Sequence, residues 1–142
     1  MANPATILRF NSDAIDLSAR VQRTTTVVGS PALAAETIVA SLTIQGNLAV
    51  PTGILLFGWA AFTVGTSGTG VNLKIRQTDA SGSTKAATGI VTYTAADLGS
   101  LAVHAFDTGP TLPGQVYVMT ATVASGGAVS TFSAVQLTAI VV

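Results

Sequence analysis

The sequence predicts an all-β protein built from antiparallel strands. Short apolar runs recur along the chain, separated by Gly, Pro, Asn and Ser about every ten residues. Several of these runs alternate apolar and polar residues, which is the period of a strand with one buried face. No stretch longer than two turns follows the helical period. These features favour two antiparallel sheets packed as a β-sandwich, or a closed barrel.

Three strands are predicted in the first half. Residues 37–44 alternate, with Ile, Ala and Leu on one face and mostly Thr and Ser on the other. Residues 53–65 are almost continuously apolar, which is typical of a strand covered on both faces. Residues 71–76 alternate apolar positions with Asn72, Lys74 and Arg76, which indicates one solvent-facing side.

The second half predicts four more strands. Two lie at 85–93 and 100–106, and two form a final hairpin, 115–124 and 128–141, across Ser125-Gly126-Gly127. Residues 21–28 add either a first strand or a junction. Eight antiparallel strands in two sheets make a jelly roll. An immunoglobulin-like sandwich is the alternative, weakened because the chain has no cysteine for the usual disulfide.

The N-terminal segment differs from the rest. Residues 1–30 hold half of the basic residues of the chain and two of its acids. We interpret them as an extended arm with a possible first strand, and 31–142 as the jelly-roll domain. The charged side chains of the arm can bind a partner through charge-assisted hydrogen bonds. The alternative is an ordinary disordered terminus.

Charge is scarce throughout the chain. It has 142 residues, of which six are basic and six acidic, and none of the 37 residues from Thr37 to Leu73 is charged. Charged residues make up 8% of the chain, against about 25% in typical soluble domains. Removing Thr and Ser side chains from water costs less free energy than removing Lys or Glu. The composition therefore predicts a protein that buries surface against other copies or partners, and not one that attracts nucleic acid or anionic membranes.

One apolar run approaches the length of a membrane span. Residues 48–64 are apolar over 17 positions, but Pro51, Gly53 and Gly58 interrupt them and no Lys or Arg flanks them closely. We interpret this run as a buried strand. Residues 1–10 lack the basic and apolar regions of a signal peptide.

The sequence offers little for catalysis. His104 is the only histidine, and a triad would have to use Ser100 and Asp107 with it. Side chains four apart in a strand are about 13 Å apart, and no nucleophile elbow is present. We therefore expect His104 to be a strand residue and the protein not to be an enzyme.

Metal and phosphate sites are equally weakly supported. Asp13 and Asp16 are the only close acidic pair, without a liganding pattern around them. We interpret Asp79 and Asp107 as isolated loop residues whose carboxylates help to form turns. The glycines of 65–70 join two strands and do not open a helix, so they cannot cradle a phosphate. We expect no metal and no cofactor.

Four runs carry a resemblance to a known family. They are 36–44, 51–64 with Gly58-Trp59-Ala60, 114–120 and 133–142. In residue pattern and in strand order, residues 34–142 resemble small jelly-roll proteins of tailed-phage virions, which are the capsid decoration or cement proteins. The resemblance implies a homotrimer on the virion surface, seated between capsomers, whose N-terminal arm clamps the major capsid protein. It also implies that no residue is catalytic.

Two residue sets follow as candidates. The chemistry of the arm selects six possible capsid-binding residues: Arg9, Phe10, Asp13, Asp16, Arg20 and Arg23. In a two-sheet sandwich the second cover of 53–65 must come from a neighbouring subunit or from the arm. This selects four possible oligomer-interface residues: Leu55, Phe57, Trp59 and Phe62.

A second function stays open at this point. The alternative is a carbohydrate- or receptor-binding head domain of a trimeric fibre. Such a domain would use aromatic residues at a loop rim, and the candidates are Trp59, Phe62, Tyr93 and Tyr117. Exposure of these rings would favour this hypothesis, and burial would count against it.

Overall fold

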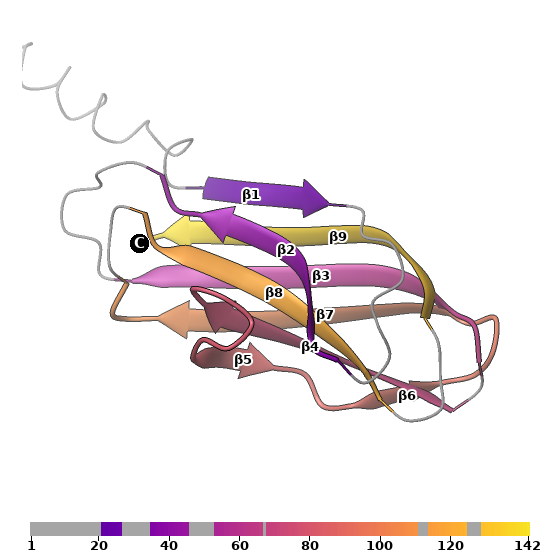
Figure 1. Cartoon of the computed structure of the whole chain (residues 1–142). Coiled ribbons are helices and arrows are strands. Elements are labelled where there is room, and N and C mark those ends of the chain that lie inside the picture. Colours follow the sequence, from indigo (N-terminus) through magenta and orange to yellow (C-terminus); the bar gives the residue numbers. More distant parts are fainter. Residues whose placement is uncertain (1–20, 27–34, 46–52, 67, 111–113, 125–128) are drawn as a thin grey trace, which may run out of the picture.

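A computed structural model describes residues 21–26, 35–45, 53–66, 68–110, 114–124 and 129–142. These residues form two antiparallel sheets packed face to face (Figure 1). Five of the six proposed arm residues lie outside the described ranges: Arg9, Phe10, Asp13, Asp16 and Arg20. The sixth, Arg23, lies in the first strand.

Nine strands are present in these ranges. They are β1 (Val21–Thr26), β2 (Thr37–Thr43), β3 (Ile54–Val64), β4 (Thr69–Gln77), β5 (Thr84–Ala87), β6 (Val91–Tyr93), β7 (Leu98–Asp107), β8 (Val116–Ala124) and β9 (Val129–Val141).

The strand order is that of a jelly roll. One sheet has the order β1-β9-β3-β7, and the other has β2-β8-β4-β5 with β6 also paired to β4. The two halves of the chain pair antiparallel, as in one long hairpin that is folded up into two sheets. In this hairpin β1 pairs with β9, β2 with β8, β3 with β7, and β4 with β5 and β6. Successive pairs alternate between the sheets, and the pairings β9–β3 and β8–β4 complete each sheet. This confirms the predicted jelly-roll sandwich and excludes the immunoglobulin-like alternative.

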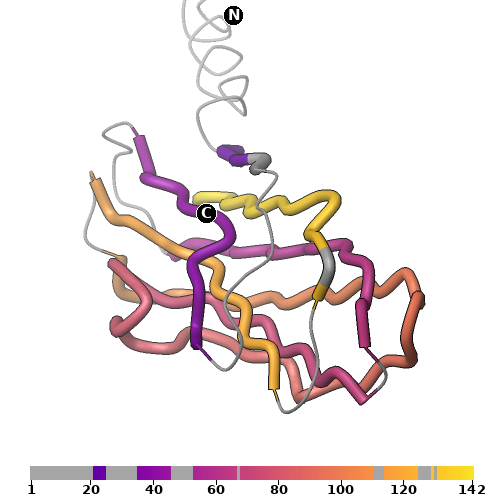
Figure 2. The backbone as a smooth tube through the Cα atoms, turned by 45° about the vertical axis from the view of Figure 1, so that its right-hand side comes forward, coloured from indigo at the N-terminus to yellow at the C-terminus, as the bar shows by residue number. Residues whose placement is uncertain are grey.

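The predicted final hairpin is wrong. β8 and β9 follow each other in the chain, but they lie in different sheets (Figure 2). Consecutive strands cross from sheet to sheet in this topology, so a turn signal between two strands does not imply that they pair.

The predicted strand at 85–93 is two strands. β5 and β6 both pair with β4 and are separated by residues 88–90. Thr88 bridges this break, because its N–H donates to the Leu73 carbonyl at 2.8 Å and its hydroxyl accepts the Leu73 N–H at 2.9 Å.

The residues at 21–26 belong to the sandwich. β1 pairs with β9 along its whole length. The side-chain amide of Gln22 also forms two hydrogen bonds with the backbone of Gln45, which follows β2 in the other sheet, each 2.8 Å long. β1 is therefore fixed to both sheets.

The alternation predicted for 37–44 holds only in part. Ala40, Leu42 and Ile44 are buried as predicted. A bulge between Ile38 and Ala40 shifts the register against β8, so that Val39 enters the core and Ile38 is exposed. A bulge adds one residue to a strand and reverses the faces on one side of it.

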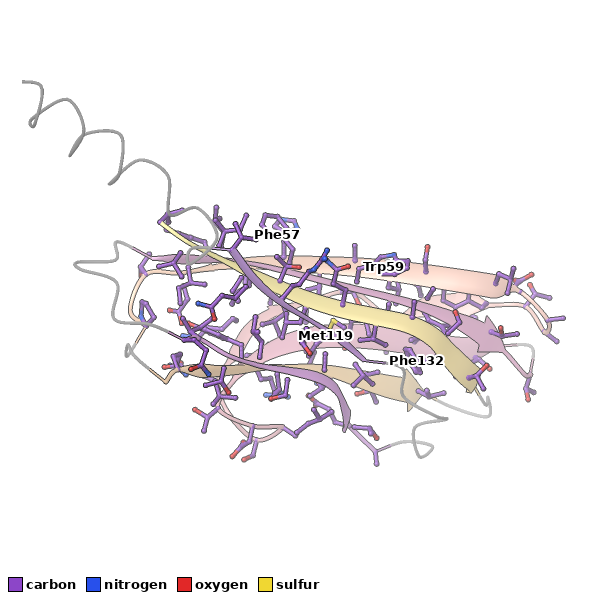
Figure 3. All side chains as sticks on the ribbon, turned by 90° about the horizontal axis from the view of Figure 1, so that it is seen from above. Phe57, Trp59, Met119 and Phe132 are labelled. Atoms are coloured by element: carbon purple, nitrogen blue, oxygen red, sulfur yellow. The ribbon has the colours of Figure 1, made fainter. Side chains whose placement is uncertain are left out.

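The core fills the space between the sheets. Its largest fully buried side chains include Phe62, Phe132 and Tyr117. Gly58 of β3 makes room for Met119 of the opposite sheet, because a Cβ at Gly58 would lie 2.5 Å from the Met119 sulfur. Met119 is fully buried (Figure 3).

Candidate functional site

The outward side of the β1-β9-β3-β7 sheet is the candidate site, and we call it the outer face. Residues opposite each other in antiparallel strands point to the same side, so the strand register defines rows across this face. The first row is entirely apolar and consists of Val21, Ile140, Leu55 and Phe106. The Phe106 ring also covers Gly53, where an added Cβ would lie 2.5 Å from the ring.

The next rows carry two exposed aromatic side chains. Phe57 lies between Thr138 and His104, and Trp59 lies between Gln136 and Ala102. Phe57 is 46% exposed and Trp59 42% exposed, which is unusual for aromatic residues in the middle of a strand. Figure 3 shows both residues on the ribbon. They border a shallow depression of about 260 Å³, lined by Phe57, Gly58, Trp59, Ala102, Val103, His104, Gln136 and Thr138.

The outer face is almost uncharged and exposes several large hydrophobic side chains. It holds five of the nine exposed large hydrophobic side chains of the described residues: Val21, Phe57, Trp59, Leu98 and Phe106. Arg23, which lies opposite Thr138, is its only Lys, Arg, Asp or Glu within the described part of the chain. Contiguous exposed apolar surface of this kind marks interaction sites.

β3 places three of the four predicted interface residues on this face. Leu55, Phe57 and Trp59 point outward, whereas the residues between them are buried. Within the residues that the structure describes, only the inner side of β3 is covered, so a second cover would have to come from outside this described sandwich.

Phe62 does not belong to this surface. It is 1% exposed and packs in the core against Tyr93, at 5.1 Å between ring centroids, and Phe132, at 5.5 Å. Its selection as an interface residue is wrong because even-numbered residues of β3 face inward.

β7 contributes residues that sequence reasoning missed. Leu98 and Phe106 are 86% and 52% exposed on the outer face. The alternation of β7 carries the signal, since Phe106 shares its side of the strand with His104 and Ala102.

Ser100, His104 and Asp107 do not form a triad. His104 and Ser100 point outward, four residues apart, whereas Asp107 points into the sandwich. The described residues contain no group of three or more His, Asp or Glu side chains placed to hold a metal ion. They also contain no helix that is long and apolar enough to cross a membrane.

Asp107 is a buried link between the sheets, so its interpretation as an isolated loop acid is wrong, whereas its hydrogen bond from the Gly109 N–H is the local contact expected of a turn-forming acid. It ends β7 and is 5% exposed. Its carboxylate accepts a hydrogen bond from the Tyr117 hydroxyl at 2.7 Å and from the Gly109 N–H at 3.2 Å, and it pairs with the Lys85 ammonium at 3.1 Å. Burial opposes its ionisation, but these three donors hold the pKa of Asp107 below its usual value. Burial, and then the Asp107 carboxylate, raise the pKa of Tyr117.

The other sheet carries a cluster of paired charges on its outward side. Glu36, next to β2, accepts hydrogen bonds from Arg76, from Lys74 at 2.8 Å and from the Thr120 hydroxyl at 2.6 Å. The Arg76 hydrogen bonds, followed by those from Lys74 and Thr120, outweigh burial and lower the pKa of Glu36 to about 2. The two sheets therefore present different outward surfaces, one with paired charges and one nearly without charge.

The aromatic residues proposed for sugar binding do not gather at a loop rim. Tyr117 and Phe62 are in the core, and Tyr93 is partly buried against Phe62. Only Trp59 of the four is well exposed, in the middle of the sheet. Asp79 behaves as predicted, since its side chain accepts hydrogen bonds from the Ser81 N–H and hydroxyl within one turn.

No family model matches the sequence, and no curated protein matches it significantly. Solved structures do match. A chain from the structure of infectious bursal disease virus, Gx strain, has a TM-score of 0.54 and 14% identity, covering 87% of this chain and 32% of that one. A chain from the VP2 subviral particle of infectious bursal disease virus has a TM-score of 0.50 and 14% identity, covering 87% and 33%.

These matches concern the fold. The chain spans about one third of the length of each virus chain. A chain from the disulfide-linked pili of Bacillus endospore appendages, with 13% identity and coverage of 86% and 88%, has a TM-score of 0.46, too low to argue a shared fold.

Proposed function

We propose that this chain is a structural protein of a virus particle, a decoration or cement protein that binds and stabilises the capsid exterior. The observation that carries the proposal is the outer face, a broad sheet surface with exposed Phe57 and Trp59 and almost no charge. Such a surface suits burial in a permanent assembly. The jelly-roll fold agrees with it, since structures of virus particles contain chains of similar fold.

In this proposal the protein forms a homotrimer and its arm contacts the major capsid protein. The trimer would cover Leu55, Phe57 and Trp59 of the outer face. The proposed arm, residues 1–20, directly precedes Val21 in the sequence, and Val21 belongs to the apolar first row of the outer face. Arg23 adds a cation at the same edge strand.

The role requires binding energy and no chemistry. A protein that binds only the closed shell lowers the free energy of that shell by mass action, and many equivalent sites multiply the effect. No catalytic residue, cofactor, nucleic acid or membrane enters this role.

The test is a binding experiment with capsids assembled without this protein. We expect the full chain to sediment with the capsids and to raise the temperature at which they open. A variant lacking residues 1–20 should keep its β-sheet circular dichroism but stay in the supernatant. Full-length protein that leaves the capsids unbound and unstabilised would refute the proposed function. Normal binding by the shortened variant would refute only the role of the arm.

A further inference from the structure

We infer that β7 is a pairing edge, through which two copies of this chain join their sheets antiparallel about a two-fold axis at Ala102. The inference goes beyond the proposed function, because it concerns a contact between copies that exists with or without a capsid. Strand edges carry unpaired N–H and C=O groups that attract other strands, and soluble proteins normally protect them.

Three of the four sheet edges in the described structure carry such protection. β1 is six residues long and holds Arg23. β2 contains the bulge at Ile38 and follows Glu36. The edge formed by β5 and β6 is broken into strands of four and three residues. Shortness, charge and bulges are the usual means of blocking edge pairing.

β7 is neither short nor bulged, and it carries no outward-facing charge. It runs for ten residues in an unshifted register with β3. It contains no proline, Lys, Arg or Glu, and its one acid, Asp107, points inward. Within the described part of the chain no strand pairs with its second edge.

The free backbone groups of β7 belong to its outward-facing residues. The Val64 N–H donates to the Asp97 carbonyl at 3.0 Å, which continues the β3–β7 register. Hydrogen-bonded partners alternate in an antiparallel ladder, so the odd-numbered residues of β7 bond to β3 and the even-numbered residues point away. The side-chain hydroxyl of Tyr93 already donates to one of these outward carbonyls, that of Ser100, at 3.3 Å. A carbonyl oxygen has two lone pairs and can accept a second donor.

One register pairs all five outward residues with a second copy. With Ala102 opposite itself, Ser100 faces His104 of the second copy and Leu98 faces Phe106. Leu98 and Phe106 are the two large hydrophobic side chains of β7 that are exposed. Each would cover the other at both ends of the contact, and the small Ala102 side chain lies on the axis. No pair of like charges arises, whereas a two-fold contact through Arg23 or Glu36 would bring like charges together.

The first test measures the mass of the full chain in solution and that of charge variants at the axis. Ala102→Lys and Ala102→Glu should each lower the native mass twofold relative to wild type, because each places like charges opposite each other. An equimolar mixture of the two variants should restore the original mass. Thr92→Lys, an exposed position on the β6 edge, should leave it unchanged. An unchanged mass for both Ala102 variants overturns the inference.

The second test maps the register with single cysteines, since the chain has none of its own. Ala102→Cys should form a dimer with a short bis-maleimide, because opposed Cα atoms lie about 5.5 Å apart. Leu98→Cys should not link to itself, because two copies of residue 98 would be about 26 Å apart along the strands. A mixture of Leu98→Cys with Phe106→Cys should link. Efficient self-linking of Leu98→Cys overturns the register.

The β7 contact and the proposed capsid function can be refuted independently of each other. A chain whose mass and cross-links exclude the β7 contact, but which still stabilises capsids, refutes this inference alone. A chain that shows the expected cross-links and leaves capsids unbound refutes the proposed function alone.

Discussion

The hydrogen bond between Tyr117 and Asp107 should be a main link between the two sheets. Tyr117 lies in β8 of one sheet and Asp107 in β7 of the other, and both are buried. In Tyr117→Phe the carboxylate keeps Lys85 and the Gly109 N–H, so we expect the free energy of unfolding to fall by about 1.5–3 kcal/mol, the range for a hydrogen bond to a charged group. Asp107→Ala should cost more, about 3–5 kcal/mol, because it leaves Lys85 without its partner and the Tyr117 hydroxyl buried.

A double-mutant cycle isolates this interaction. Urea unfolding of wild type, both single variants and the double variant should give a coupling free energy of about 1.5–3 kcal/mol at neutral pH. The folded-state pKa of Asp107 is lowered, so its contribution is present above the usual Asp pKa and is lost as the pH falls through the folded value. The coupling should therefore shrink in acid. A coupling below about 0.5 kcal/mol at neutral pH, the usual scatter of independent sites, would refute the link.

Three further predictions concern single changes. Glu36→Gln removes a group whose folded pKa is about 2, so it should lower the free energy of unfolding by about 1–2 kcal/mol above pH 5, after allowance for solvent screening. The difference from wild type should disappear as the pH falls toward 2. Equal dependence of stability on acid pH in the two proteins would contradict this. Gly58→Ala should lower the free energy of unfolding by about 1–3 kcal/mol by displacing Met119, and pairing it with Met119→Ala should recover part of the loss; simple additivity would contradict the contact. Wild type should lose stability above about pH 10, where Tyr117 ionises only in the unfolded chain, and Tyr117→Phe should lose less over the same range; identical alkaline unfolding would argue against the raised pKa of Tyr117.

The sequence predicted the fold class better than the contacts. Residues 71–76 alternate without interruption, and β4 buries Val71, Leu73 and Ile75 as expected. The hairpin predicted for 115–124 and 128–141 was wrong because a Gly-rich sequence predicts a reversal of the chain but does not predict which sheet the next strand joins.

Site residues were predicted only where local pattern decides the outcome. The apolar run of β3 does not alternate in sequence, so the strand period places Phe57 and Phe62 on opposite sides but does not tell which of the two sides faces the core. Asp107 looks like a turn residue because its partners, Tyr117 and Lys85, come from the other sheet. Such contacts depend on topology, which a local pattern does not encode.

Trp59 offers the most direct test that the outer face is buried in an assembly. It is the only tryptophan of the chain and is 42% exposed in the single sandwich. Acrylamide quenching of its fluorescence should be severalfold weaker on the capsid-bound or self-assembled protein than on the dissociated chain, with emission shifted to the blue. Equal quenching in the assembled and dissociated states would show that the outer face stays open to solvent and would contradict the account.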